Sequence, residues 1–549
     1  MRIASLFRTP DAIRSNFTAE VDSSKCVACG QCVENCPVNA VQLGQRLCAK
    51  NPAPEKEVRT VRDHLWSEKD YNVDYRENRQ DVAEEGTSPC KTACPAHIAV
   101  QGYIKLASQG KYREALELIK KENPFPAVCG RICPHGCESE CTRGDIDEPI
   151  AIDEIKKFIA DQELNSEHRF VPEKRHNYGK KIAVVGAGPA GLACAYYLAI
   201  GAQGGRKLGV EGEDAQGVIT GVDFLREVNL GHDVKLSGKA VVIGGGNVAI
   251  DVARTAVRTG ADNVSLFCLE SRAEMPALDE EVEETLAENI AINNSWGPRR
   301  ILTENGKVTG VEFHKCVSVF DKDGRFAPVF DEENIKTVEA DCVLMSIGQS
   351  IQWGGLLEGS KVQLGRGNAA VADSLTYQTA EPDVFVGGDA FTGPKFAIHA
   401  IAAGKEGAIS IHRYVQPGQS LTLGRDRREY HAFDKSNVVM DGFDNAPRQQ
   451  IGHNPQAKIS FKDTRMTFTE EQMKKETERC LGCGAAQVDS YMCVGCGQCT
   501  TKCKFDAIHL VRTHNSTPDT YEHLPMKMAA NAVKRVGKIA VTAVKEIGK

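Results

Sequence analysis

The sequence predicts an α/β fold that combines two strand–turn–helix units with cysteine-rich segments near both ends of the chain. Glycine-rich turns follow short apolar runs at two places, and the 21 cysteines stand mostly in short-spaced groups. A helical pattern separates two of these groups. At 549 residues, the chain is long enough for several domains, each with its own core.

Composition narrows the function classes. The net charge of -7 is small for this length, so nothing indicates a nucleic-acid partner. No run is long and apolar enough to span a bilayer, and the N-terminus lacks the apolar core of a secretory signal. We therefore expect a soluble, cytoplasmic protein whose cysteines bind metal rather than form disulfides.

A bacterial ferredoxin pattern, C-x2-C-x2-C-x3-C followed by proline, lies in the first 50 residues and comprises Cys26, Cys29, Cys32 and Cys36. It predicts a ferredoxin-like segment over 1–50 that holds a [4Fe-4S] cluster. The fourth cysteine either closes this cluster or reaches a second one, and Cys48 is a candidate to complete the set. Structural zinc is disfavoured, because zinc sites usually contain two C-x2-C pairs.

The charged stretch 51–88 is predicted to be a linker, and 89–170 a helical iron–sulfur domain. Six cysteines lie on both sides of a helical pattern, and they suit four-iron clusters better than zinc: Cys90, Cys94, Cys129, Cys133, Cys137 and Cys141. The apolar positions of that pattern predict the core residues Ile104, Leu106, Ala115, Leu116, Leu118 and Ile119.

The first glycine-rich turn lies within Lys181–Ile200. Lys181–Val185 is predicted to be a buried strand, and a G-x-G-x-x-G turn then opens a helix, with the candidate pyrophosphate-binding residues Gly186, Gly188, Pro189, Ala190 and Gly191. Such a unit also needs a second strand that ends in an acidic residue about 20 residues on. Glu211 and Glu213 are in range, but no strand precedes them, and we interpret them as loop carboxylates.

The second unit is intact. The strand Lys239–Ile243 leads into a G-x-G-x-x-A turn with the candidate residues Gly244, Gly246, Asn247, Val248 and Ala249. The next strand ends at Glu270, followed by Ser271 and Arg272. A carboxylate there binds ribose hydroxyls and repels a 2′-phosphate, which favours NAD(H) over NADP(H). Arg272 keeps NADP(H) open, and a solvated strand end is the alternative reading of Glu270.

A second ferredoxin run lies in 478–513, after a predicted linker over 416–477. It contains Cys493, Cys496, Cys499 and Cys503, and the pair Cys480 and Cys483 precedes it. Two ligation schemes remain. Either Cys480, Cys483 and Cys503 help to build a second cluster locally, which we favour because it needs less long-range closure, or the two terminal runs fold together and exchange Cys36 and Cys503.

The remaining segments carry less chemistry. The basic tail 514–549 predicts a helix with Val533, Val536, Ala540, Val544 and Ile547 on or near one face. Docking to a partner subunit is the preferred interpretation, ahead of a solvated tail or weak membrane contact. Isolated cysteines on apolar elements are expected to be core residues: Cys194, Cys268, Cys316 and Cys342.

From Ser88 to about Tyr414 the chain closely resembles the family of the glutamate synthase small subunit. That family includes the N-terminal half of dihydropyrimidine dehydrogenase and the large subunit of electron-bifurcating ferredoxin-dependent transhydrogenases. The resemblance implies that all six cysteines between Cys90 and Cys141 match ligand positions, and that a C-x2-C pair is missing upstream of Cys90. It also implies FAD in a discontinuous domain over 179–236 and 344–415, around an NAD(P) domain over 237–343. The flavin-binding residues would include Gly348, Gly388, Asp389, Lys395 and Ala397.

The resemblance also exposes a gap. In the family, the phrase AYYLA is followed by the acidic strand and a further unit, whereas this chain continues directly into GAQGG. We expect a segment to be absent between Ile200 and Gly201, because the half of the flavin site around Asp389 would otherwise have no second half with which to bind FAD. Cα atoms much farther apart than about 3.8 Å at that junction would show it.

These parts predict an NAD(P)H-linked, FAD-dependent oxidoreductase subunit with about four to five [4Fe-4S] clusters. No catalytic side chain is expected, because binding and spacing the cofactors suffice. So many clusters indicate other redox subunits as partners, of the flavoprotein, hydrogenase or ferredoxin-reducing type, with ferredoxin and electron bifurcation as options. The alternatives are a glutamate synthase small subunit and a non-catalytic scaffold with a defective flavin site.

Overall fold

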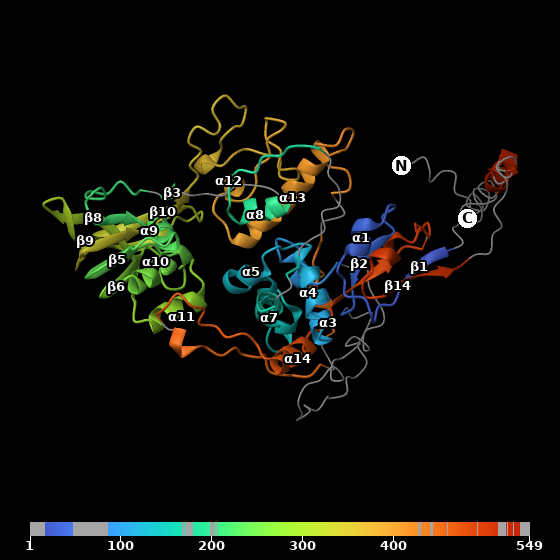
Figure 1. Cartoon of the computed structure of the whole chain (residues 1–549), viewed down its shortest axis with the longest axis horizontal. Helices are drawn as coiled ribbons and strands as arrows, with labels where there is room; N and C mark the ends of the chain where they lie inside the picture. The colour runs from blue at the N-terminus through green and yellow to red at the C-terminus, as the bar shows by residue number, and fades with distance from the viewer. Residues whose placement is uncertain are drawn as a thin grey trace, which may run out of the picture.

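The computed structural model describes residues 17–47, 86–166, 169–170, 179–197, 204–205, 207–425, 430–439, 443–457, 459–490, 492–513 and, in shorter pieces, 523–537. Figure 1 shows a nucleotide domain at one side, a helical bundle in the middle with a pair of helices above it, and a small module of two-stranded sheets at the other side. The fold is mixed α/β, as predicted.

Both ends of the chain build that small module, which we call the terminal module (17–47 and 484–513). The N-terminal part supplies β1 (Phe17–Val21), α1 (Gln31–Asn35) and β2 (Val41–Gln45), and the C-terminal part supplies β13 (Gly484–Val488), α15 (Gln498–Lys502) and β14 (Ile508–Arg512). β1 pairs antiparallel with β14, and β2 with β13. Alanines from both parts share one core. The two ferredoxin runs, expected as separate segments, therefore lie in one folded unit.

The helical bundle follows the predicted pattern. Its helices are α2 (Pro89–Thr92), α3 (Val100–Ser108), α4 (Tyr112–Lys120), α5 (Pro126–Ile132), α6 (Gly136–Ser139) and α7 (Ile152–Leu164). All six predicted core residues, from Ile104 to Ile119, are buried in it. α5 and α7 approach closely at Gly130, where a Cβ would lie 2.9 Å from the Cα of Lys157. The helix that carries Cys129 therefore packs directly against α7.

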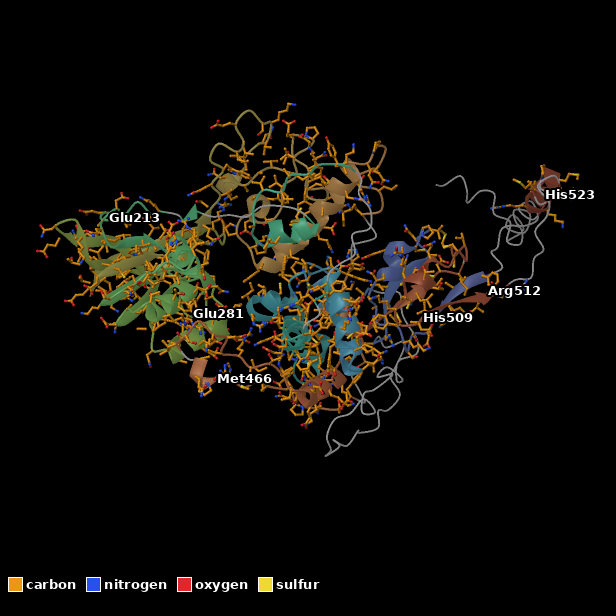
Figure 2. All side chains as sticks on the ribbon, in the orientation of Figure 1. Glu213, Glu281, Met466, His509, Arg512 and His523 are labelled. Atoms are coloured by element: carbon orange, nitrogen blue, oxygen red, sulfur yellow. The ribbon has the colours of Figure 1, made fainter. Side chains whose placement is uncertain are left out.

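The stretch 416–477, expected to be a linker with little chemistry, instead ends as part of the bundle. α14 (Glu470–Glu478) starts with a capping box between Thr469 and Gln472. Glu476 is fully buried and accepts hydrogen bonds from the backbone of Ala151 and Gln449, both at 2.8 Å. Its carboxylate also pairs with Arg479 at 2.7 Å. These bonds fix the chain immediately before Cys480. Farther upstream, Met466 lies between the bundle and the nucleotide domain (Figure 2).

The nucleotide domain contains a five-stranded parallel sheet in the order β4-β11-β5-β6-β7. Its strands are β4 (Val218–Thr220), β5 (Lys239–Ile243), β6 (Asn263–Cys268), β7 (Ala291–Asn294) and β11 (Cys342–Met345). One face packs on α9 (Gly221–Asn229), α10 (Asn247–Arg258) and α11 (Asp279–Ala287). The second strand–turn–helix unit predicted from the sequence is thus present.

An antiparallel sheet covers the other face of the parallel sheet. It consists of β8 (Trp296–Glu304), β9 (Lys307–Phe320) and β10 (Phe326–Glu339) in the order β10-β9-β8. The rings of Phe267 and Phe313 stack between the two sheets with centroids 4.1 Å apart. The parallel sheet is therefore buried on both faces, which explains its nearly continuous apolar strands.

The first glycine-rich unit folds only in part. Its helix α8 (Pro189–Tyr197) lies along α13 (Ala397–Tyr414), and Gly404 allows the approach because a Cβ there would lie 2.7 Å from the carbonyl oxygen of Ala190. The run Lys181–Val185, predicted to be a buried strand, is not a strand, and Ile182 and Val185 are 42% and 47% exposed. Within the described residues it has no sheet neighbour, and a strand needs one to satisfy its backbone.

Several predictions fall wholly or partly on residues outside the described part of the chain. These are Cys48, the linker up to residue 85, the junction of Ile200 with Gly201, and Ala540, Val544 and Ile547 of the tail. The described pieces of 525–537 are helical, with Val533 and Val536 exposed. β3 (Gly204–Gly205) follows the junction and pairs with β12 (Gln349–Ser350). Among the helices described, none has the length and apolar character needed to cross a bilayer.

Candidate functional site

Three cysteines of the N-terminal run line one cavity together with a cysteine of the C-terminal run. This first group contains Cys26, Cys29, Cys32 and Cys503. Backbone amides point at the sulfurs: Ala486 donates to the Sγ of Cys26 at 3.0 Å, and Ala507 to that of Cys503 at 3.4 Å. Such donors favour thiolate charge.

In the second group the contributions of the two runs are reversed. Cys36 lines a cavity with three cysteines of the C-terminal run, Cys493, Cys496 and Cys499. Ala40 donates to the Sγ of Cys36 at 3.2 Å and Ala19 to that of Cys493 at 3.4 Å. Cys496 is exposed. The arrangement follows the exchange of Cys36 and Cys503 between the two runs, not the local scheme that we favoured.

The third group joins the bundle to the stretch after α14. Cys90 and Cys141 line a cavity with Cys480 and Cys483. Burial raises the pKa of Cys90 well above its usual value, and the neighbouring sulfurs of the group add to the shift. The C-x2-C pair that joins Cys90 and Cys141 therefore lies far downstream in the chain, whereas the family resemblance implied a pair upstream of Cys90. One sequence signal was available. The second ferredoxin run already contains four cysteines of its own, so Cys480 and Cys483 have no further cysteines nearby with which to complete a cluster.

The fourth group lies entirely within the bundle and consists of Cys94, Cys129, Cys133 and Cys137. Burial raises the pKa of Cys137 well above its usual range, with further contributions from Cys94 and Cys133. Burial also raises the pKa of Cys133 to about 11. Although burial opposes it, Asp153 and the sulfurs of this group raise the pKa of Lys156 on α7. The group therefore has a buried cation beside it.

Sixteen of the seventeen predicted ligands thus fall into four groups of four, and the seventeenth, Cys48, lies outside the described residues. The other cysteines are buried in the cores of their domains: Cys194, Cys268, Cys316 and Cys342. In the described part of the chain, no three side chains of ligand type converge on a single ion. Cysteines spread around a cavity fit a four-iron cluster better than one zinc ion.

The nucleotide turn follows β5. Gly244 has a φ of +145°, and a Cβ there would overlap the carbonyl oxygen of Ser346. Gly246 has open space around it, and α10 begins at the next residue, Asn247. The Oδ1 of Asn247 accepts a hydrogen bond from the backbone of Leu278 at 3.0 Å. The turn therefore leaves the N-terminus of α10 accessible for a pyrophosphate.

Glu270 lies over this turn. Its Oε2 is 2.5 Å from the position that a Cβ of Gly245 would occupy, and burial raises the pKa of its carboxyl. Ser271 donates to Glu274 at 2.7 Å, and Arg272 pairs with Asp279 at 2.8 Å. Glu270 thus lies against the glycine turn, while Arg272 is engaged by an acidic partner.

Four candidate flavin residues lie at or just before the starts of α12 (Asp389–Thr392) and α13: Gly388, Asp389, Lys395 and Ala397. Gly388 has a φ of +65° and precedes α12, and burial raises the pKa of Asp389. The Oδ1 of Asp389 accepts a hydrogen bond from the backbone of Lys395 at 3.2 Å, just before α13. Gly348 has a φ of +115° in the loop between β11 and β12.

The opposite end of the flavin site is only partly built. Gly186 has a φ of +114°, and the turn after it opens α8, so the pyrophosphate turn has formed. The acidic second strand is absent from the described residues. Glu213 accepts hydrogen bonds from the backbone of Leu208 and Gly209 at 2.9 and 2.6 Å, at the edge of the nucleotide domain (Figure 2). It therefore closes a loop, as its interpretation as a loop carboxylate implied.

Fold and site together define an iron–sulfur oxidoreductase with an FAD/NAD(P)-binding fold. Three family descriptions match the chain: dihydropyrimidine dehydrogenase domain II with a 4Fe-4S cluster over 82–168, pyridine nucleotide-disulphide oxidoreductase over 197–404, and the 4Fe-4S binding domain over 19–42 and 486–509. The last two ranges correspond to the two halves of the terminal module.

Curated relatives agree with these matches. The NADP(+)-dependent formate dehydrogenase subunit beta of Moorella thermoacetica is 30% identical over 505 residues, which cover 72% of this chain and 70% of that protein. The NADPH-Fe(3+) oxidoreductase subunit beta of Geobacter sulfurreducens is 29% identical over 509 residues, 72% and 75%. The glutamate synthase [NADPH] small chain of Escherichia coli is 28% identical over 424 residues, 60% and 89%. The chain belongs to this family of glutamate synthase small-subunit-like NAD(P)H-linked iron–sulfur oxidoreductases.

The alignment with the Moorella thermoacetica relative is longer than the part of this chain that it covers. It extends over 505 positions but covers 72% of this chain, which is about 395 of 549 residues. About 110 aligned positions therefore have no residue of this chain opposite them.

Proposed function

We propose that this chain is the nicotinamide-oxidising subunit of a larger redox complex, and that it passes electrons from NAD(P)H through FAD to four [4Fe-4S] clusters. The observation that carries the proposal is the division of sixteen cysteines into four groups of four, three of which line cavities. The groups form a row that starts beside the flavin region.

Contacts give the order of that row. α5, which carries Cys129 of the fourth group, contacts α13, and Cys129 shares a core with Ile398 and Ile401 of that helix. The third and fourth groups meet at α2, because Cys90 lies in this short helix and Cys94 lies two residues after its end, and Tyr103 is buried beside both. The third group meets the first, and the first shares its two runs with the second, whose Cys496 is exposed. The row thus leads from α13 to the surface.

The chemistry divides the tasks between cofactors and protein. A flavin accepts a hydride as an electron pair and releases single electrons, which iron–sulfur clusters carry one at a time. The residues of this chain bind and space these groups: the glycine turns accept pyrophosphates, Asp389 contacts the ribityl side, and the bundle buries the sulfurs. No side chain has to transfer a proton to the nicotinamide in this scheme.

An anaerobic titration of the purified protein with NADH tests the proposal. We expect bleaching of the visible flavin and cluster absorbance, with about sixteen iron atoms per chain. An intact mass above 59.7 kDa by the mass of about 110 residues would show that the protein has residues beyond this sequence, and a tryptic peptide that joins Ile200 to Gly201 would exclude a segment between them. Clusters without any flavin, and without bleaching, would contradict the proposal and favour a scaffold.

We further propose NAD(H) as the preferred nucleotide. Glu270 over the glycine turn supports it, whereas the names of the relatives from Moorella, Geobacter and Escherichia contain NADP or NADPH. Replacing Glu270 with arginine should shift the ratio of kcat/KM for NADH to that for NADPH by more than about tenfold toward NADPH, because the 2′-phosphate gains a cation and loses a repulsive carboxylate.

The control for Glu270→Arg is Glu283→Arg, which makes the same charge change at an exposed position of α11. It should leave the ratio unchanged. An unchanged ratio in Glu270→Arg as well would remove Glu270 from the ribose site.

The partner is proposed to be another redox subunit, since the Moorella and Geobacter relatives are named as beta subunits. A glutamate synthase small subunit is the second candidate, because the match covers 89% of the Escherichia coli protein. The terminal module adds two cysteine groups at the surface end of the row and favours the first candidate. Co-purification with a glutaminase-bearing large subunit would decide for the second.

A further inference from the structure

The first and third cysteine groups meet at a joint between the terminal module and the bundle. Arg46 is fully buried there. Its Nη2 donates to the carbonyl oxygens of Cys26 at 2.5 Å and Gly484 at 3.3 Å, and its backbone N–H donates to the carbonyl of Cys483 at 2.9 Å. One guanidinium therefore contacts the loop of the first group and the residue that follows a ligand of the third group.

A second buried cation spans the same two groups. Lys91 follows Cys90 of the third group in the sequence and is 3% exposed. Its Nζ donates to the carbonyl of Cys29, a residue of the first group, at 3.3 Å and to the carbonyl of His97 at 2.8 Å. Burial lowers the pKa of Lys91, and the nearby carboxylates of Glu122 and Glu34 oppose that shift.

A neutral side chain closes the joint. With its amide oriented to satisfy its hydrogen bonds, Gln101 donates to the carbonyl of Val27 and accepts from the backbone N–H groups of Cys483 and Gly484. Gly484 has no room for a side chain, since a Cβ there would lie 2.9 Å from the Cβ of Ala28. The joint is therefore tightly packed, and charge inside it is poorly screened.

Iron–sulfur clusters bound by four thiolates carry net negative charge, and their reduction potentials depend on nearby charge and hydrogen bonds. Two such clusters in neighbouring sites repel each other, and each added electron increases that repulsion. A cation held between them lowers the energy of the reduced state of both. The fully buried position of Arg46 makes this effect larger than it would be at the surface.

We propose that Arg46 and Lys91 are positioning residues that hold positive charge between the clusters of the first and third groups; this inference rests on the function proposed above. They raise the reduction potentials of both clusters and make this joint the crossing point for electrons between the bundle and the terminal module. Arg46 has the larger effect, because the negative charges of Glu34 and Glu122 lie near Lys91. The hydrogen bonds of Arg46 and Lys91 involve the loops of the first and third groups, so we expect the potentials of the second and fourth clusters to stay unchanged.

Arg46→Gln tests this role, because glutamine retains an N–H donor but removes the charge. Redox titration of the purified protein, followed by electron paramagnetic resonance, should show two of the four cluster signals shifted to lower midpoint potential and two unchanged. Arg46→Lys should restore most of the shift. Arg425→Gln is the matched control, because Arg425 is an equally buried arginine that bonds to Glu406 and Ser410 on α13.

Iron analysis distinguishes a failure of this inference from a failure of the proposed function. Full iron content with four unshifted potentials in Arg46→Gln would overturn this inference and leave the proposed function intact. Wild-type protein that holds no clusters would overturn the proposed function and the inference with it. If Arg46→Gln does not retain its clusters, the same titration of Lys91→Met decides: a smaller downward shift of the same two signals supports the role, and no shift overturns it.

Discussion

Replacing Cys483 with serine should remove one whole cluster and lower the iron content by about four atoms per chain. The reason is that Cys483 lines the third cavity with Cys90, Cys141 and Cys480, so its loss leaves three thiolates in a buried site. Colorimetric iron and sulfide assays on anaerobically purified protein measure the change. Cys342→Ser, a buried cysteine outside the four groups, should leave the iron content unchanged.

A double variant distinguishes the two ligation schemes. In the observed grouping, Cys483 and Cys503 belong to different groups, so Cys483→Ser/Cys503→Ser should lose about eight iron atoms, the sum of the single losses. In the local scheme both cysteines serve one cluster, and the double variant would lose no more than either single variant. That second outcome would refute the grouping of the third cavity.

Replacing Gly244 with alanine should abolish NADH binding and lower the free energy of unfolding by about 2–4 kcal/mol. Gly244 has a φ of +145°, which a Cβ makes costly, and the added methyl group would overlap the carbonyl oxygen of Ser346 at the end of β11. The alanine therefore displaces the turn from the sheet. Thermal unfolding and fluorescence titration with NADH measure the two effects separately.

Gly246→Ala in the same turn is the matched variant. No atom lies within 4 Å of the position of its Cβ, so stability should stay the same. The methyl group would still obstruct the approach of the pyrophosphate, and NADH should bind more than about tenfold more weakly. Normal NADH affinity in Gly246→Ala would mean that the nucleotide does not lie on this turn.

The sequence was most informative where the chemistry is local. The spacing from Cys26 to Cys36 predicted a ferredoxin-like segment, and the run from Lys239 to Ala249 predicted a strand, a turn and a helix in the right places. Each of these patterns lies within a few residues and requires little help from the rest of the chain. The 4Fe-4S matches over 19–42 and 486–509 confirm the ferredoxin-like segments.

What local patterns could not provide was the partner of each cysteine. The exchange of Cys36 and Cys503 depends on β1 pairing with β14, and those strands lie at opposite ends of the sequence. The position of Cys480 depends on Glu476 and Arg479 inside the bundle. Spacing favours nearby partners, because short loops cost less entropy to close, and here tertiary packing outweighed that preference.

Lys181–Val185 is a segment for which the local pattern predicted a strand that the structure does not contain. Its apolar, β-branched composition predicts a strand, and the glycine turn and helix after it do form. A strand, however, is defined by its neighbours, and the described residues offer none. The local sequence specified the turn, whereas a strand also needs sheet neighbours, which the described residues do not supply.

The pairing of β1 with β14 also sets an order in which the protein matures. During synthesis, the cysteines of the fourth group all leave the ribosome within one short stretch, so that site is complete early. The first, second and third groups each wait for residues after Glu478. Cys26 to Cys36 are therefore made first and completed last, and a nascent chain holds them as open thiols until its C-terminal residues arrive.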